Sequence, residues 1–248
     1  MPSAPLSVQL YTVREALAAD LPGTLARIAD LGFTDVELYG FADREHEFAD
    51  GLAAAGLRAP SGHASLVAVE DPAVVFAVGQ RLGLTTVIDP AIPAERWADR
   101  EGVATIASQL NALAPMASEH GVRVGYHNHD WELSSVIDGT PALEVLADLL
   151  DDDVALEVDT FWSEVGGVPA ADLLRRLGDR VTHIHVKDGP LTKETATQTA
   201  VGAGGLDIAG ILAAAPQAQP VVELDDHTGD VFEALRESVA YLTSGVRG

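Results

Sequence analysis

Short β-rich apolar runs alternate along the chain with Ala- and Leu-rich segments in which apolar residues recur at helical spacing. The β-rich runs predict strands at residues 6–13, 34–40, 58–65, 85–90, 122–129, 154–162, 181–188 and 220–226. The segments between them predict helices at residues 21–32, 47–56, 72–83, 140–150 and 169–178. Several of these helices end on a glycine, which is the preferred residue just after a helix.

Eight strands joined by helices are the number that closes a (β/α)8 barrel. A doubly wound open sheet uses similar units. Eight near-regular repeats that leave too little sequence for a second domain favour the barrel instead. No Pro/Ser-rich linker, low-complexity tract or break in composition divides the chain. We therefore predict an α/β fold in which residues 1–248 form a single (β/α)8 barrel, the TIM-barrel fold.

The predicted strands end in polar residues, although a strand buried on both faces should carry Val, Ile and Leu throughout. Residues two apart in a strand share a face, so inward residues near the C-terminal ends point at the barrel mouth. These residues are Gln9, Tyr11, Glu37, Tyr39, His63, His127, His129, Glu157, Asp159, His183, His185, Lys187, Glu223 and Asp225. So many polar strand ends indicate a functional site at the mouth.

Four of these residues, His127, Asp159, His185 and Glu223, fall on successive strands at corresponding depths. Two imidazoles and two carboxylates could then converge on one point, which is typical of a divalent metal site. Nitrogen and oxygen ligands without sulfur suit Mn, Co, Zn, Mg, Fe or Ni, and the sequence does not choose among them. The alternative is a hydrogen-bonded cluster without metal, although packed carboxylates favour a cation.

Charge and composition narrow the choice of partners. Lys and Arg total 15 against 38 Asp and Glu, for a formal charge of -23 that repels nucleic acid and anionic lipid. The chain has no cysteine, which excludes thiolate ligands and thiolate nucleophiles. It also lacks a signal-peptide pattern and a run of about 18 apolar residues, so we expect a cytoplasmic protein without a membrane span.

The chain resembles the sugar phosphate isomerase/epimerase family of xylose isomerase-like barrels along nearly its whole length. The resemblance rests on LSVQLYTVRE (6–15), YHNHDWEL (126–133), EVDTFW (157–162), GGVPAADLLRRLGDRVTHIHVKD (166–188), VGAGGLDIAGIL (201–212) and VVELDD (221–226). It implies a metal-dependent enzyme with a small sugar as substrate. Similar barrels are often dimers or tetramers, so it is also compatible with a homo-oligomer.

In similar enzymes, four strands supply the metal ligands as Glu, Asp, His and Glu. The resemblance assigns the last three of these to Asp159, His185 and Glu223. The fifth strand departs from the pattern, because His127 stands where ketose epimerases have a glutamate. An imidazole can still bind a metal, but while bound it is not a free proton acceptor.

The departure on the fifth strand makes proton transfer asymmetric. We expect Glu223 to act as base on one face of the sugar, and His129 or Glu132 to take the other role. The remaining polar residues at the mouth are expected to contact substrate. They are Glu37, His63, Asn128, Trp162 and Lys187.

The predicted activity is proton abstraction next to a carbonyl of a sugar or sugar derivative, giving isomerisation or epimerisation. A lyase or hydrolase of 3-oxo-glycosides, which uses the same enolisation, is the alternative. A barrel-type apurinic endonuclease needs a basic surface for phosphate contacts, which the charge opposes. A non-catalytic sugar-binding barrel would bind no metal and show no turnover.

The glycine-rich segment VGAGGLDIAG (201–210) invites a nucleotide-binding interpretation. Its glycines follow a loop rather than a strand, and Asp207 stands where that motif needs its third glycine. We instead predict a turn that leads into a helix, with Asp207 as the N-cap residue.

Overall fold

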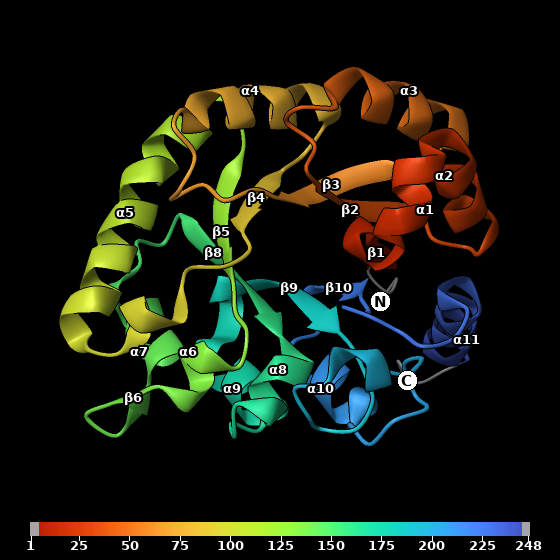
Figure 1. Ribbon diagram of the computed structural model, residues 1–248. Helices are drawn as coiled ribbons and strands as arrows, with labels where there is room; N and C mark the ends of the chain where they lie inside the picture. Colours follow the sequence, from red (N-terminus) through yellow and green to blue (C-terminus); the bar gives the residue numbers. More distant parts are fainter. Residues whose placement is uncertain (1–4, 245–248) are drawn as a thin grey trace.

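The computed structural model describes residues 5–244, in which eight parallel strands close into a barrel. The strand order is β1-β10-β9-β8-β5-β4-β3-β2, which confirms the (β/α)8 architecture (Figure 1). The barrel strands are β1 (Ser7–Gln9), β2 (Asp35–Tyr39), β3 (Arg58–His63), β4 (Thr86–Asp89), β5 (Arg123–His127), β8 (Val154–Asp159), β9 (Val181–Val186) and β10 (Gln219–Val222).

Helices surround the barrel, and α3, α4 and α5 form an arc outside the strands in Figure 1. The helices are α1 (Arg14–Ala19), α2 (Leu21–Asp30), α3 (Glu45–Ala55), α4 (Pro72–Leu82), α5 (Arg100–Glu119), α6 (Trp131–Ser134), α7 (Ala142–Leu149), α8 (Thr160–Val165), α9 (Ala170–Leu177), α10 (Ile208–Ala214) and α11 (Val231–Thr243). A two-stranded hairpin, β6 (Val136–Ile137) and β7 (Thr140–Pro141), follows α6. Within residues 5–244, no helix has the length and apolarity to cross a membrane.

The five helices predicted from the sequence are confirmed as α2, α3, α4, α7 and α9, with ends within two residues of the prediction. The longest helix, α5, was not among them. Its interior contains Pro115, a residue that usually marks the end of a helix because it lacks an N–H and crowds the preceding turn.

Several predicted strands are too long at their C-terminal ends, because polar residues there start the next helical turn. The Gln9 side chain accepts a hydrogen bond from the N–H of Tyr11 and opens the 3-10 helix Leu10–Val13. The Asp159 carboxylate accepts a hydrogen bond from the N–H of Trp162 and caps α8. The strand ends are thus fixed by side chains of the barrel mouth.

The glycine-rich segment forms a turn that leads into a helix, as predicted. Asp207 is the N-cap of α10, and its carboxylate accepts a hydrogen bond from the N–H of Gly210. Gly202 in the preceding turn has a φ of 90°, in the left-handed region that favours glycine.

The buried carboxylate of Asp188, which follows β9, organises this turn. Its Oδ1 accepts hydrogen bonds from the N–H groups of Gly189 and Leu206, at 2.9 and 3.2 Å. Its Oδ2 accepts from the N–H groups of Gly202 and Gly204, at 2.9 and 3.1 Å. One side chain therefore holds together both ends of a loop of the barrel mouth.

We expect Asp188→Ala to lower the free energy of unfolding by about 3 kcal/mol, because it leaves four backbone donors without their charged acceptor. Asp188→Asn keeps one acceptor oxygen and should be intermediate. Urea unfolding at neutral pH measures both variants. A value for Asp188→Ala within about 0.5 kcal/mol of the parent, which is typical of a surface substitution, would contradict this role.

Candidate active site

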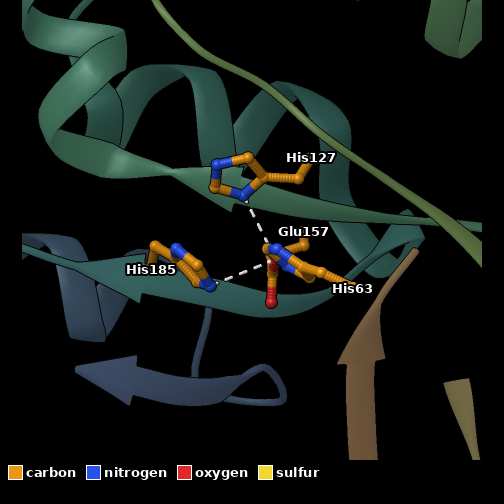
Figure 2. A group of neighbouring side chains, drawn as sticks. All are labelled: His63, His127, Glu157 and His185. Carbon is orange, nitrogen blue, oxygen red and sulfur yellow. Dashed lines mark hydrogen bonds and ion pairs between the residues drawn. The ribbon is translucent and has the colours of Figure 1, made fainter. Parts of the chain in front are cut away.

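Three imidazoles converge on one carboxylate at the barrel mouth, in a group that we name the histidine cluster: His63, His127, Glu157 and His185 (Figure 2). The Oε2 atom of Glu157 lies 2.7 Å from Nε2 of His63, 3.1 Å from Nδ1 of His127 and 3.2 Å from Nε2 of His185. The other oxygen of Glu157 is buried without a hydrogen-bond partner. These residues come from β3, β5, β8 and β9.

Glu37 on β2 lies next to the histidine cluster and contacts two of its imidazoles. Its Oε1 lies 2.7 Å from Nε2 of His185 and 3.1 Å from Nε2 of His63, and accepts a hydrogen bond from the Gln9 amide at 2.9 Å. Its Oε2 accepts a 2.5 Å hydrogen bond from the Ser61 hydroxyl. Glu37 is therefore fully engaged inside the barrel.

Protonated imidazoles of the histidine cluster balance the negative charges of Glu157 and of the neighbouring Glu37. Burial opposes the charge on His63, but the carboxylates of Glu37 and Glu157 outweigh it and raise the His63 pKa to about 10. The same competition raises the pKa of His185 well above its usual value, through Glu157 and Glu223. Burial raises the carboxyl pKa values of Glu37 and Glu157, yet the imidazoles bring both below their ordinary value. Two imidazolium ions thus compensate two carboxylates.

A second group, which we name the lysine site, consists of Lys187, Asp159, Glu223 and Asp225. The Lys187 ammonium lies 2.9 Å from Asp159, 2.8 Å from Glu223 and 2.7 Å from Asp225. The lysine side chain is 1% exposed, so burial opposes its charge, but the three carboxylates raise its pKa well above the usual value. Burial likewise opposes ionisation of Glu223, yet Lys187 and His185 bring its pKa well below normal.

The structure divides the four metal ligands expected from the sequence between the two groups. Asp159, His185 and Glu223 each offer a ligand atom within 4.8 Å of the others, whereas His127 belongs to the histidine cluster. His127 is still near, because its Nε2 lies 3.8 Å from Oδ2 of Asp159. The His185 ring joins the groups, with Nδ1 2.7 Å from Glu223 and Nε2 facing the histidine cluster.

A pocket of about 710 Å³ opens onto these groups. His127, His129 and Glu223 border it, and so do two of the expected substrate contacts, His63 and Trp162. The other three expected contacts are not among its lining residues: Glu37, Asn128 and Lys187. All three are buried in contacts to other protein groups.

Asn128 and Glu132 hold the segment that follows β5 rather than facing the pocket. The Asn128 side chain accepts a 3.1 Å hydrogen bond from the N–H of Asp159 and donates to the backbone oxygen of His129 at 3.1 Å. The Glu132 carboxylate accepts from the Tyr126 hydroxyl at 2.5 Å and from the N–H of His129 at 2.8 Å. Both side chains therefore position His129.

His129 itself faces the pocket as a neutral imidazole. Burial lowers its pKa to about 2, and the neighbouring His127 and Lys187 act in the same direction. Its ring stacks on Trp131 with centroids 4.4 Å apart, and its Nδ1 is buried without a hydrogen-bond partner. A neutral imidazole offers one donor and one acceptor to a bound molecule.

Sequence reasoning did not assign Arg14 and Phe41 to the site, although both line the pocket. They lie beyond the ends of β1 and β2, where the period of two no longer tells which way a side chain points. Glu157 was recognised as a polar strand end but not as the centre of a cluster. Its spacing of two from Asp159 on an inward face was the available signal.

A closed barrel with polar side chains gathered at the C-terminal strand ends has the architecture of the TIM barrels. Residues 25–242 match the family model for the xylose isomerase-like TIM barrel, so the chain belongs to that family. The resemblance noted from its motifs is therefore confirmed.

Relatives in this family carry different activities in their names. Inosose dehydratase from Clostridium perfringens is 34% identical over 85 residues, which is 34% of this chain but only 28% of that relative's length. A sugar phosphate isomerase/epimerase structure from Parabacteroides distasonis has a TM-score of 0.82 at 22% identity, covering 98% of this chain and 94% of its own. A structure of IOLI protein with bound zinc has a TM-score of 0.69 at 16% identity, covering 96% of both chains.

Burial raises the Glu132 pKa from an ordinary 4.5 to about 8, despite the opposing hydrogen bond from Tyr126. The folded chain therefore keeps a proton that the unfolded chain loses above pH 4.5, so this group's stabilisation falls as pH rises towards 8. We expect Glu132→Gln to gain stability relative to the parent across this range, by up to about 1.4 kcal/mol per pH unit.

Urea unfolding at several pH values between 5 and 8 measures this difference. The exposed Glu101→Gln on α5 is the matched control and should run parallel to the parent. Parallel curves for Glu132→Gln and the parent would show instead that Glu132 is ionised in the folded protein.

Proposed function

We propose that this protein is a sugar isomerase or epimerase that removes a proton from the carbon next to a carbonyl, with a divalent metal at the barrel mouth. The observation that carries the proposal is Glu223, an ionised carboxylate that borders the pocket and also lies 2.7 Å from His185. It can reach both a substrate proton and a cation. Membership of a family with isomerases and epimerases among its relatives supports this.

The ligands that we propose for the metal are His127, Asp159, His185 and Glu223. Because a ligating imidazole must be neutral, binding of the ion would release the Nδ1 proton of His185. The fit rests on the donor set around Oδ2 of Asp159, which lies 3.8 Å from Nε2 of His127, 3.9 Å from Nδ1 of His185 and 2.9 Å from the Lys187 ammonium, a cation that already pairs with this oxygen. The other oxygen of Asp159 caps α8. These side-chain atoms are oxygen and nitrogen donors, which suit Mn, Co, Zn, Mg or Fe.

The balance of charge also favours a cation at this place. In the lysine site, three carboxylates share the single ammonium of Lys187, whereas the histidine cluster is neutralised by its own protons. A divalent ion would complete the compensation of the lysine site. When bound, such an ion supplies Lewis-acid polarisation of the substrate carbonyl.

The chain's own residues divide the remaining tasks. We propose that Glu223 accepts the substrate proton, and that the neutral imidazole of His129 hydrogen-bonds a substrate oxygen across the pocket. His63 and Trp162 form the pocket wall. Glu132, which the sequence left as a possible acid, is proposed as a positioning residue because it binds the N–H of His129.

A lyase is the second candidate, because the first step would be the same proton abstraction. The name of the relative inosose dehydratase favours it, since a dehydratase expels a leaving group from the neighbouring carbon. The test that separates the two is the product, which keeps the composition of the substrate in an isomerase or epimerase and loses a group in a lyase.

We expect protein purified without chelator to hold one divalent ion per chain, and Asp159→Asn to weaken its binding at least about tenfold. Asparagine keeps the cap of α8 but loses the negative charge next to His127 and His185. Elemental analysis and titration with Mn or Zn give the occupancy. Retention of the ion in Asp159→Asn, together with its loss in Glu157→Gln, would locate it in the histidine cluster instead.

We expect Glu223→Gln to slow exchange of the substrate's α-proton with deuterated solvent by roughly 10²- to 10⁴-fold, the usual effect of losing a general base. Proton NMR on a ketose or a 3-oxo sugar follows the exchange, and metal content is measured on the same sample. Asp226→Asn, an exposed pocket residue on the same loop, is the control. Undiminished exchange in Glu223→Gln with metal bound would exclude Glu223 as the base.

A further inference from the structure

The pocket above the site has two ends of different chemistry within its volume of about 710 Å³. The deep end is polar and is bordered by His63, His127, His129 and Glu223. Pockets of about 300–1,000 Å³ usually take a drug-sized ligand, so this one is larger than a single sugar ring needs. The outer end therefore has room for a second group.

The outer end is lined mainly by apolar and aromatic side chains, contributed by the end of β2 and by the segments that follow β1 to β4. They include Tyr11, Tyr39, Phe41, Ala42, Pro90 and Ala91. The rings of Tyr11 and Tyr39 meet edge to face, with centroids 5.5 Å apart. Tyr11 is 42% exposed, and the Arg14 guanidinium lies over its ring at 4.4 Å from the centroid, so the exposed part of the ring is what a ligand can contact.

Aromatic side chains at a pocket mouth contribute by burying apolar surface and by stacking on rings. Tyr11 lies in the 3-10 helix that follows β1, and Tyr39 is the last residue of β2, the strand that pairs with β1. Their edge-to-face contact fixes the angle between two aromatic surfaces. This geometry suits a flat or ring-shaped apolar group better than a hydrated hydroxyl-rich one.

Electrostatics at the pocket oppose a phosphate. Arg14 is the one Lys or Arg side chain among its lining residues in the described part of the chain, whereas the lining contains four carboxylates, those of Asp43, Glu223, Asp225 and Asp226. The Nη1 of Arg14 already donates to the backbone oxygens of Tyr11 at 3.1 Å and of Asp225 at 2.9 Å. Phosphate recognition usually uses several Arg or Lys donors, whereas this lining offers one guanidinium against four carboxylates.

We infer that the substrate is an unphosphorylated sugar derivative that carries an apolar, ring-containing substituent, with the sugar at the polar end of the pocket and the substituent against Tyr11 and Tyr39. The inference rests on the proposed function for the position of the reacting sugar. It adds the chemical class of the substrate, a glycoside with an apolar aglycone whose sugar ring carries the oxo group that the proposed reaction requires.

Calorimetric titration of the metal-loaded full chain tests this without any need for turnover. The probes are phenyl D-glucoside, methyl D-glucoside of the same anomeric form, and glucose 6-phosphate. We expect the phenyl glucoside, in its better-binding anomer, to bind about tenfold more tightly than the methyl glucoside, and glucose 6-phosphate to bind most weakly.

Substitution of the two tyrosines assigns the preference to the outer end. Tyr11→Ala combined with Tyr39→Ala should reduce the ratio of phenyl to methyl affinity to about one, while the affinity for methyl glucoside stays within about twofold. Tyr11→Phe combined with Tyr39→Phe keeps both rings and should keep the ratio. The phenylalanine pair also controls for folding.

Three results would overturn the inference: no phenyl preference in the parent, a preference that survives the double alanine variant, or glucose 6-phosphate binding as tightly as methyl glucoside. The exchange experiment on Glu223 judges the proposed chemistry separately. Proton exchange without a phenyl preference rejects the substrate class alone. A phenyl preference without proton exchange rejects the proposed reaction alone.

Discussion

The carboxylates buried at the barrel mouth impose the constraint on which the rest of the site depends. A buried charge costs several kcal/mol unless it is paired, so each of these groups needs a positive partner within hydrogen-bond reach. Lys187 compensates the carboxylates near the pocket, and His63 compensates Glu37 deeper in the barrel. His185 couples the two regions because its ring nitrogens face Glu223 and Glu37. Loss of any partner would leave an uncompensated charge, so the two groups behave as one electrostatic unit.

The same side chains also end the strands and start the following turns. Asp159 uses Oδ1 to cap α8 and pairs Oδ2 with the Lys187 ammonium, so its orientation is fixed before any metal binds. Gln9 accepts the N–H of Tyr11 through its oxygen and donates to Glu37 through its nitrogen. Site geometry and backbone geometry are therefore not independent. This explains why residues at the strand ends, rather than loop residues, set the positions of the reacting groups.

Two sequence patterns were sufficient to predict the barrel and its strand count: strand residues two apart share a face, and strands alternate with helices. The same patterns predicted the convergence of Asp159, His185 and Glu223. These patterns could not predict how deep in the barrel each side chain lies. Strands of a barrel are staggered, so equal distance from a strand end does not mean equal height, and His127 groups with Glu157 and His185 rather than with Asp159 and Glu223.

Long and branched side chains limited the sequence analysis in a second way. Lys187 was expected to contact substrate, but its flexible chain brings the ammonium into a buried group of carboxylates. Asn128 could have pointed to the pocket or to backbone, and only the path of the segment after β5 decides for backbone. Such choices depend on three-dimensional partners that no periodicity encodes.

The presence of a histidine at position 127, on the fifth barrel strand, also follows from the need to pair the buried carboxylates. His127 lies 3.1 Å from Glu157 through one ring nitrogen and 3.8 Å from Asp159 through the other. A glutamate at this position, as the ketose epimerase pattern would have it, would face two carboxylates at short range, and like charges at such distances oppose ionisation. An imidazole removes that repulsion, because one nitrogen can donate to Glu157 while the other stays available beside Asp159. The departure from the family pattern at position 127 is thus matched to the carboxylate of Glu157 on the neighbouring strand, β8.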